Sequence, residues 1–177
     1  MSEQNQVRTM DVVPYNDDWK EDYHSESEKI CNVLSTEMIN IYHIGSTAIP
    51  GIFAKPVIDI LVEVRNITYI DNYNSEMESL DYIPSGESGI EGRRYFFKSL
   101  YKRTHHIHIF ETGNPEISKH INFRDYLIAH PEDANRYEEL KKELSIKFRY
   151  DSRYYVAGKD TFIKDIDRKA ALWVKLR

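Results

Sequence analysis

Residues 39–64 read INIYHIGSTAIPGIFAKPVIDILVEV. The first six residues alternate and are rich in β-branched side chains, which predicts a strand over 39–44 that ends at Gly45. The stretch 57–64 (VIDILVEV) alternates in the same way and predicts a second strand. The segment between them holds two prolines and a glycine, so we expect a loop there. This stretch makes a sheet the starting point of the fold.

Outside this stretch the periodicity changes along the chain. It predicts, in order, helices over about 18–38 and 67–81, strands over 93–101 and 104–110 joined by a short turn, and helices over about 117–129, from Pro131 onward and over about 159–175. Strands first and helices last indicate an α+β fold. We expect one domain over 1–177, with a sheet-bearing core at about 11–112 and a helical part at about 116–177.

The composition suits a folded domain outside the membrane. Of the 177 residues, 41% are hydrophobic and 12% aromatic, and no apolar run is long enough to span a bilayer. Residues 1–10 lack the apolar stretch of a signal peptide. A single cysteine, Cys31, excludes an internal disulfide and a zinc site built from cysteines. The sequence therefore predicts a cytoplasmic protein with no membrane partner.

Charge is distributed unevenly over the chain, whose formal net charge is −5. Residues 1–135 carry 12 basic and 22 acidic side chains, whereas residues 136–177 carry 12 basic and 7 acidic ones. Such a chain is not a general binder of nucleic acid, and a nucleic-acid partner is not expected. The basic helical part either faces an anion or is an ordinary solvated helix surface.

The end of the first strand carries the most informative motif. Gly45 lets the backbone approach a ligand closely, and the adjoining Ser46 and Thr47 can hold phosphate oxygens. Asp59 follows on the next strand, where a carboxylate can hold a divalent ion that bridges those phosphates. Gly-Ser turns are common, however, and a single aspartate on a strand also serves as a structural hydrogen-bond partner.

Two histidines on a later strand offer further metal ligands. In Thr104–Ile109 (THHIHI), Ile107 and Ile109 take one face, which puts His106 and His108 together on the other. With Asp59 they would make a set of two histidines and one carboxylate. The same residues also fit a solvated strand face or histidines that are hydrogen-bonded to their neighbours.

Basic side chains that could neutralise phosphate are frequent near these motifs, namely Lys55, Arg93, Arg94, Lys98, Lys102 and Arg103. Arginines beside aromatic residues bind phosphate or stack on a base. An edge strand protected by charge against pairing has the same pattern. There is no Walker-type loop and no Gly-x-Gly-x-x-Gly sequence, so a P-loop kinase and a dinucleotide site are not expected.

The motif His43–Gly51 (HIGSTAIPG) followed by Lys55–Val62 (KPVIDILV) resembles the signature of the GrpB family. The resemblance extends over about residues 11–172 and includes Phe123–Leu127 (FRDYL). It implies a nucleotidyltransferase-like mixed sheet with flanking helices. Members of this family also occur fused to dephospho-CoA kinase. In the wider superfamily a Gly-Ser turn holds nucleotide phosphates, and a following strand carries two carboxylates that bind Mg²⁺.

This sequence departs from the active pattern of that superfamily. The positions two residues before and after Asp59 are Val57 and Leu61, and Glu63 lies about 13 Å along the strand, too far to share one metal directly. Two-metal transfer needs ions about 3.5–4 Å apart, which one carboxylate holds poorly. Either histidines replace the missing carboxylate, or the fold binds a nucleotide without transferring it.

We therefore expect a nucleotidyltransferase-like protein that binds a nucleotide or another phosphorylated small molecule with a divalent metal, Mg²⁺ or Mn²⁺, or Zn²⁺ through the histidines. The expected catalytic residues are Asp59 and Ser46, and the metal ligands are Asp59, His106 and His108. The expected phosphate-binding residues are Gly45, Ser46, Thr47, Lys55, Arg94 and Lys159. The alternatives are a non-catalytic nucleotide-binding or chaperone-like module related to coenzyme A metabolism, and a histidine-metal hydrolase.

Overall fold

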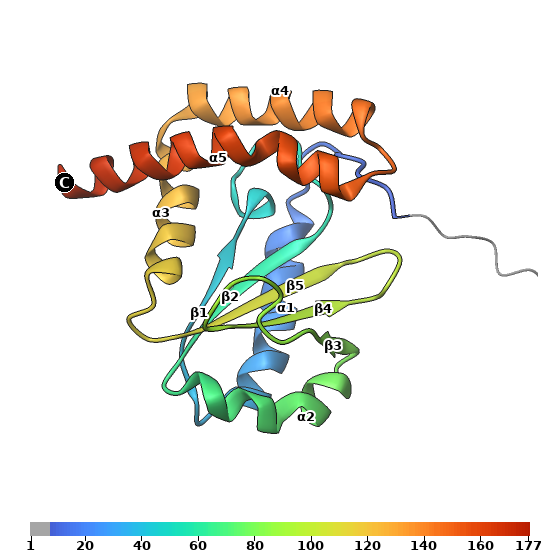
Figure 1. The fold of residues 1–177 in the computed structure, drawn as a ribbon, viewed down its shortest axis with the longest axis vertical. Helices are drawn as coiled ribbons and strands as arrows, with labels where there is room; N and C mark the ends of the chain where they lie inside the picture. Colours follow the sequence, from blue (N-terminus) through green and yellow to red (C-terminus); the bar gives the residue numbers. More distant parts are fainter. Residues whose placement is uncertain (1–7) are drawn as a thin grey trace, which may run out of the picture.

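The computed structural model describes residues 8–177, and residues 1–7, which belong to the stretch expected to lack a signal peptide, lie outside the described part. Within these described residues five strands form one sheet in the order β1-β2-β5-β4-β3 (Figure 1). The strands are β1 Met38–Ile44, β2 Ile58–Val64, β3 Tyr82–Pro84, β4 Arg93–Lys98 and β5 His105–Glu111. The helices are α1 Asp18–Leu34, α2 Asn74–Glu78, α3 Pro115–Ala129, α4 Pro131–Lys147 and α5 Ser152–Lys175. The predicted α+β class is confirmed.

The sheet is mixed, because β2 and β5 are parallel while every other neighbouring pair is antiparallel. A parallel pair needs a long crossover, and here the chain passes through α2, β3 and β4 before β5 returns beside β2. The resulting register sets Asp59 opposite His106 and Leu61 opposite His108. The topology therefore brings together two motifs that are far apart in the sequence.

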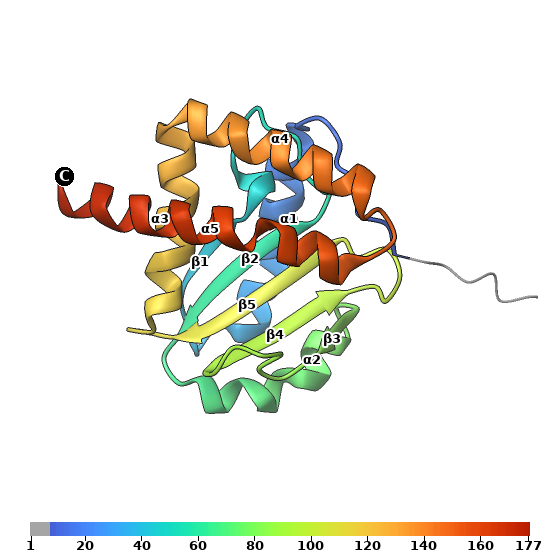
Figure 2. The ribbon, with the colours of Figure 1, turned by 45° about the horizontal axis from the view of Figure 1, so that its top comes forward.

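The two faces of the sheet differ in chemistry. Alternate residues of β2 and β5 pack with α1 in the largest hydrophobic cluster, among them Ile58, Ile60, Val62, Val64, Ile107 and Ile109. Full burial of each such side chain stabilises the fold by about 1.5–3 kcal/mol. Figure 1 shows α1 behind the sheet and α5 above it, and in the turned view of Figure 2 α5 crosses in front of the sheet. The face toward α5 carries Asp59 and the histidines.

Two predicted elements end differently in the structure. The helix predicted over 18–38 ends at Leu34, because a turn follows and Met38 already pairs with Val64 as the first residue of β1. The side chain of Met38 is partly buried in the same cluster as the helix, so it fits both periodicities. The strand predicted over 93–101 ends at Lys98, because Ser99 takes a φ of 67° and turns the chain out of the sheet.

The prediction of one α-helix over 67–81 is wrong, because most of this stretch has another secondary structure. Residues Ile67–Tyr73 form a 3-10 helix, which begins where the Asn66 side chain accepts a hydrogen bond from the Thr68 amide (3.0 Å), and only the short α2 follows. Asp81, with a φ of 67°, then turns the chain into β3, a strand that the sequence analysis did not predict.

The last helix begins earlier than the predicted residue 159. The Asp151 carboxylate accepts hydrogen bonds from the amides of Arg153 and Tyr154, which starts α5 at Ser152. Gly158 then lies inside the helix, although glycine disfavours helix interiors. A Cβ at this position would lie 2.5 Å from Leu144 Cδ2, so glycine allows α4 and α5 to pack closely.

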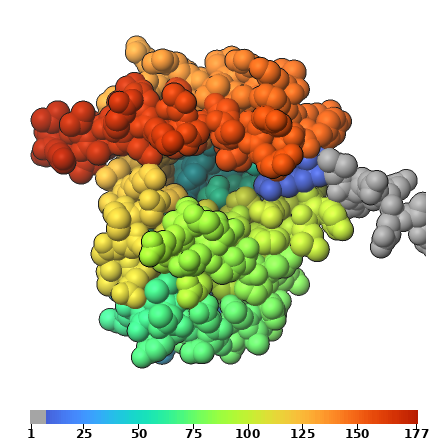
Figure 3. All heavy atoms as spheres, viewed as in Figure 1, coloured from blue at the N-terminus to red at the C-terminus, as the bar shows by residue number. Residues whose placement is uncertain are grey.

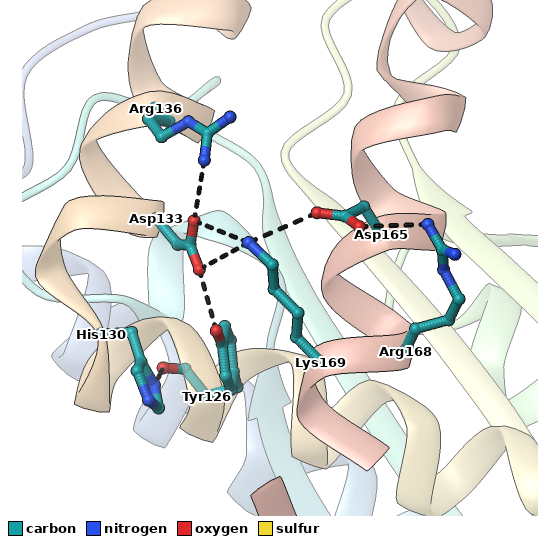
Figure 4. A network of polar contacts seen from close by, with 7 residues as sticks. All are labelled: Tyr126, His130, Asp133, Arg136, Asp165, Arg168 and Lys169. Carbon is teal, nitrogen blue, oxygen red and sulfur yellow. Dashed lines mark hydrogen bonds and ion pairs between the residues drawn. The ribbon is translucent and has the colours of Figure 1, made fainter. Parts of the chain in front are cut away.

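A polar network joins the three C-terminal helices (Figure 4). Asp133 on α4 accepts a hydrogen bond from the Tyr126 hydroxyl of α3 (2.8 Å) and pairs with Lys169 of α5 (3.1 Å). The ring of His130 stacks on that of Tyr126 at 3.9 Å. These contacts fix the helical part as a unit above the sheet. In residues 8–177 no helix combines the length and apolar character needed to cross a membrane.

Candidate functional site

A pocket of about 600 Å³ opens between the sheet and the helical part. Figure 3 shows a hollow below the helices α4 and α5, with teal atoms of the chain around β1 and β2 at its bottom. The pocket is lined by the loop after β1, by residues of β2, β4 and β5, and by α4 and α5. We call it the basic pocket, because six cationic side chains line it: Arg8, Lys55, Arg93, Arg103, Lys141 and Lys159.

Asp59 supplies the carboxylate of the basic pocket. Its Oδ1 lies 3.1 Å from His106 Nδ1 and 3.5 Å from His108 Nε2. Burial opposes ionisation of Asp59, but hydrogen bonds from the two histidines outweigh it and hold the pKa of Asp59 below its ordinary value. Asp59 is therefore ionised at neutral pH. Strand alternation predicted that His106 and His108 share a face, and the register of β2 and β5 places Asp59 against both of them.

Gly45 lies against this carboxylate. Its φ is +73°, a region that other residues rarely adopt, and a Cβ added there would lie 2.6 Å from Asp59 Oδ2. The next residues, Ser46–Ala48, form a 3-10 helix, and Ser46 and Thr47 line the pocket. The prediction that the Thr47 side chain holds phosphate is corrected, because this side chain is buried and its hydroxyl bonds to Val57 and His43. The absence of a side chain at Gly45 thus lets the loop after β1 come within contact of Asp59.

His43 supports the same loop from behind. The hydroxyl of Thr47 donates to the carbonyl of Val57 (3.3 Å), so it accepts its second bond from His43 Nε2–H (2.9 Å). The imidazole stacks on the ring of Tyr23 at 4.8 Å. Burial lowers the pKa of His43 to about 4, so the ring is neutral at physiological pH. This chain of bonds ties the loop to the start of β2.

None of the six cations of the basic pocket forms an ion pair with a carboxylate within residues 8–177. Lys55 and Lys159 both lie over the ring of Tyr155, at 5.2 and 4.7 Å from its centroid. Lys141 is 2% exposed and donates to the carbonyl of Phe53. A pocket with six such cations and the single carboxylate of Asp59 has a strongly positive potential.

Burial depresses the pKa of two of these lysines. It lowers the pKa of Lys55 to about 8, with contributions from the charges of Arg8 and Lys159. It lowers the pKa of Lys141 to about 7, with a further contribution from Lys159. Crowded cations that lose charge in this way are stabilised when an anion binds between them.

The prediction of Arg94 as a phosphate ligand is corrected. Arg94 lies on the opposite face of β4 and makes two hydrogen bonds to the Asp71 carboxylate, of 2.6 and 3.0 Å. Its neighbour Arg93 faces the pocket instead, because side chains alternate along a strand. Arg93 donates to the carbonyls of Glu87 (3.0 Å) and Ser88 (2.7 Å), which hold its guanidinium beside His108.

The donor set fits a divalent metal. One ligand atom each from Asp59, His106 and His108 lie within 4.8 Å of one another. Ligands about 2.1 Å from a shared ion lie roughly 3–4 Å apart, a range that includes both Asp59–histidine distances. His106 Nε2 is buried and has no hydrogen-bond partner among the described residues. The contact to Asp59 is made by the other ring nitrogen, Nδ1, so Nδ1 is the atom of His106 that would meet the ion.

No second carboxylate of residues 8–177 reaches this cluster. Glu63, four residues beyond Asp59, accepts hydrogen bonds from Asn40 (2.8 Å) and Thr112 (2.6 Å) at the other end of β2. Within residues 8–177 Asp59 is the one carboxylate that lines the basic pocket. The departure from the two-carboxylate pattern is thus a property of the folded site.

Part of the basic pocket was not predicted from the sequence. Lys141 shares a helix face with Tyr137 and Leu144, and a lysine within an apolar stripe is a signal that could have found it. Arg8 carries no comparable signal, because it precedes the first element. Arg93 and Arg103 were among the basic candidates, but only the register of β4 shows which arginine of the Arg93–Arg94 pair faces the site.

A model of the GrpB protein family matches residues 9–169. The UPF0157 protein YqkA of Bacillus subtilis is 45% identical over 170 residues, which are 96% of this chain and 50% of YqkA. This chain therefore spans about half the length of that relative. A dephospho-CoA kinase of Mycolicibacterium paratuberculosis is 26% identical over 92% of this chain and 46% of its own length.

One solved structure agrees with the family match. The crystal structure of the conserved protein GrpB from Enterococcus faecalis has a TM-score of 0.86 at 40% identity and covers 90% of this chain and 96% of that chain. The Cid1 poly(U) polymerase has a TM-score of 0.41 at 10% identity over 71% of this chain and 43% of its own, a partial likeness that bears on no activity. The chain belongs to the GrpB family.

Proposed function

We propose that this protein binds a nucleotide or another phosphorylated small molecule in the basic pocket, together with a divalent metal ion, and transfers a nucleotidyl or phosphoryl group. The observation that carries the proposal is that six cations line one pocket together with a single carboxylate among residues 8–177, and that none of the six forms an ion pair within those residues. Buried or half-buried cations are costly when unpaired, so a ligand with several negative charges accounts for them.

Asp59, His106 and His108 would hold the metal ion. Two imidazoles among three donors favour Zn²⁺, whereas Mg²⁺ and Mn²⁺ are better suited by oxygen ligands. A divalent ion there supplies Lewis-acid polarisation of a phosphoryl oxygen. The protein's own contribution is to orient the phosphates with Ser46 and the surrounding cations, and to stabilise negative charge that develops on the transferred group.

A second candidate function is binding without turnover, as a nucleotide-binding or chaperone-like module related to coenzyme A metabolism. The presence of one carboxylate instead of two favours it, because a two-metal clamp on the attacking and leaving oxygens needs more ligands. The similarity of this chain to part of a dephospho-CoA kinase agrees with an accessory role. Both functions use the same pocket.

The experiment is a thermal-shift and calorimetric screen of nucleoside triphosphates and coenzyme A precursors, each with Mn²⁺, Zn²⁺ or Mg²⁺. A ligand at 100 times its dissociation constant stabilises the fold by about 2.7 kcal/mol. Stabilisation that requires both metal and ligand supports the proposal, whereas a screen with no metal-dependent shift overturns it. His106→Ala should abolish the metal effect, and His105→Ala is the matched control on the other face of β5.

An assay of product formation distinguishes the two candidate functions. If the protein is a transferase, Asp59→Asn abolishes product formation while the variant keeps its fold and its cations. If it is a binding module, no product forms with the unmodified protein, and Asp59→Asn retains the phosphorylated ligand through the cations.

A further inference from the structure

We infer that a second phosphorylated ligand, one with a planar ring, binds in a cavity next to the basic pocket, with its ring against Tyr101 and its phosphate toward Arg103. This cavity has a volume of about 580 Å³ and lies between residues 8–13, the chain before β2 and the loop between β4 and β5. The inference rests on the proposed function, because the basic pocket is taken to hold the other ligand.

The two cavities are continuous in their walls. Arg8, Lys55, Val57 and Arg103 line both of them. Three of these four residues are cations, so the wall that the two cavities share is strongly positive. Ligands in the two cavities would therefore direct their phosphates toward each other, as two substrates of one transfer must.

The second cavity also lacks a free counter-charge within residues 8–177. Lys102 adds a fourth cation to its lining, and Asp11 is its one carboxylate. Asp11 is already bound by the guanidinium of Arg149, through contacts of 2.7 and 3.3 Å. The cavity consequently favours an anionic ligand.

Arg103 is built as a binding group. Its guanidinium lies 3.9 Å from the centroid of the Phe97 ring, and its Nη1 donates to the Tyr95 hydroxyl (3.3 Å). Its Nε–H is buried and has no partner among the described residues. The side chain is thus fixed in place while donors remain for a phosphate or carboxylate.

Tyr101 provides the aromatic surface. It lies in the loop between β4 and β5, it is 57% exposed, and it lines the second cavity beside Lys102. A planar base stacks on such a ring, and loss of the ring typically weakens base binding by about tenfold. A ring at one end and cations at the other match a nucleoside monophosphate in shape and charge.

Calorimetric titration with AMP tests this inference. We expect two binding events per chain. Tyr101→Ala weakens one event about tenfold and Lys102→Ala weakens the same event roughly threefold, while Tyr101→Phe restores it. Lys159→Ala, which changes only the basic pocket, weakens the other event. Lys175→Ala, at the end of α5, is the surface control and changes neither.

Titration with ribose 5-phosphate separates the contribution of the aromatic ring from that of the phosphate. This ligand has no base to stack on Tyr101, so Tyr101→Ala should leave its affinity unchanged. The inference is overturned if neither Tyr101→Ala nor Lys102→Ala changes AMP binding, or if the only event detected responds to Lys159→Ala alone. If the only event responds to Tyr101→Ala and not to Lys159→Ala, the second site stands and the function proposed for the basic pocket fails.

Discussion

Gly45 and Asp59 are in direct contact, and the missing side chain of the glycine makes that contact possible. A Cβ at Gly45 would lie 2.6 Å from Asp59 Oδ2, closer than real Cβ atoms come to other heavy atoms, and 3.1 Å from Asp59 Cγ, which is also unusually tight. Since Oδ1 of the same carboxylate meets both histidines, any shift of Asp59 disturbs the whole candidate metal site.

Gly45→Ala should therefore abolish or strongly weaken metal binding, by at least tenfold. It should also destabilise the fold by about 1–3 kcal/mol, because alanine is strained at a φ of +73°. The measurement is a titration with Mn²⁺ or Zn²⁺, alongside urea unfolding.

Gly51→Ala is the matched control for this prediction. Gly51 has a φ of +83°, but nothing lies within 4 Å of a Cβ built there. This variant should lose stability by about the same strain and keep its metal affinity. Equal metal affinity in the two variants would contradict a role for the Gly45–Asp59 contact.

Local sequence patterns predicted the sheet and its polar face well. The alternation in β5 separated His106 and His108 from Ile107 and Ile109, and the structure has this separation. Alternation reports which side chains share a face of a strand, and this depends only on local geometry.

Sequence patterns did not predict the features that tertiary contacts determine. Alternation could not say that Arg93 and not Arg94 faces the pocket, because the partner of Arg94 is Asp71, which is 23 residues away. Met38 satisfied a helical period and a strand period alike. The early start of α5 was not predicted, because Gly158 disfavours a helix interior. The glycine is needed there because Leu144 of α4 approaches closely. The division into a single domain stays a prediction.

Lys159→Met should weaken binding of inorganic pyrophosphate by about tenfold, because it removes a charge-assisted contact in a partly desolvated pocket. Lys164→Met on the same helix is the control, since Lys164 is exposed and pairs with Asp160 (2.6 Å). Raising the salt concentration should weaken pyrophosphate binding in the unmodified protein. Equal losses in the two variants would show that the effect is general surface charge.

Asp133→Ala should destabilise the fold by about 2 kcal/mol, because it removes the partner of Tyr126 and Lys169 at the junction of three helices. Asp160→Ala, which breaks one exposed pair, should cost about 0.5 kcal/mol or less. Urea unfolding at constant pH measures both. A loss of similar size in the two variants would show that the network in Figure 4 adds nothing beyond surface pairing.

Stability without ligand should rise with pH above neutrality. The pKa of Lys141 is about 7 in the folded protein, against an ordinary value of 10.5. Between these values the unfolded chain binds more protons than the folded one, so the free energy of unfolding increases as pH rises through this window. Lys55, with a pKa of about 8, acts in the same direction. Lys141→Met should flatten the pH dependence, whereas Lys147→Met, exposed on the same helix, should not.

Bound pyrophosphate should weaken this dependence, because its charge raises the pKa of both lysines toward their ordinary values. Binding at pH 7.5 should then take up protons from the buffer. Calorimetric titrations in two buffers with different ionisation enthalpies measure that uptake directly, and Lys141→Met should reduce it. Pyrophosphate binding with no proton uptake would mean that the anion does not lie beside these lysines, and the phosphate subsite would have to be placed elsewhere in the pocket.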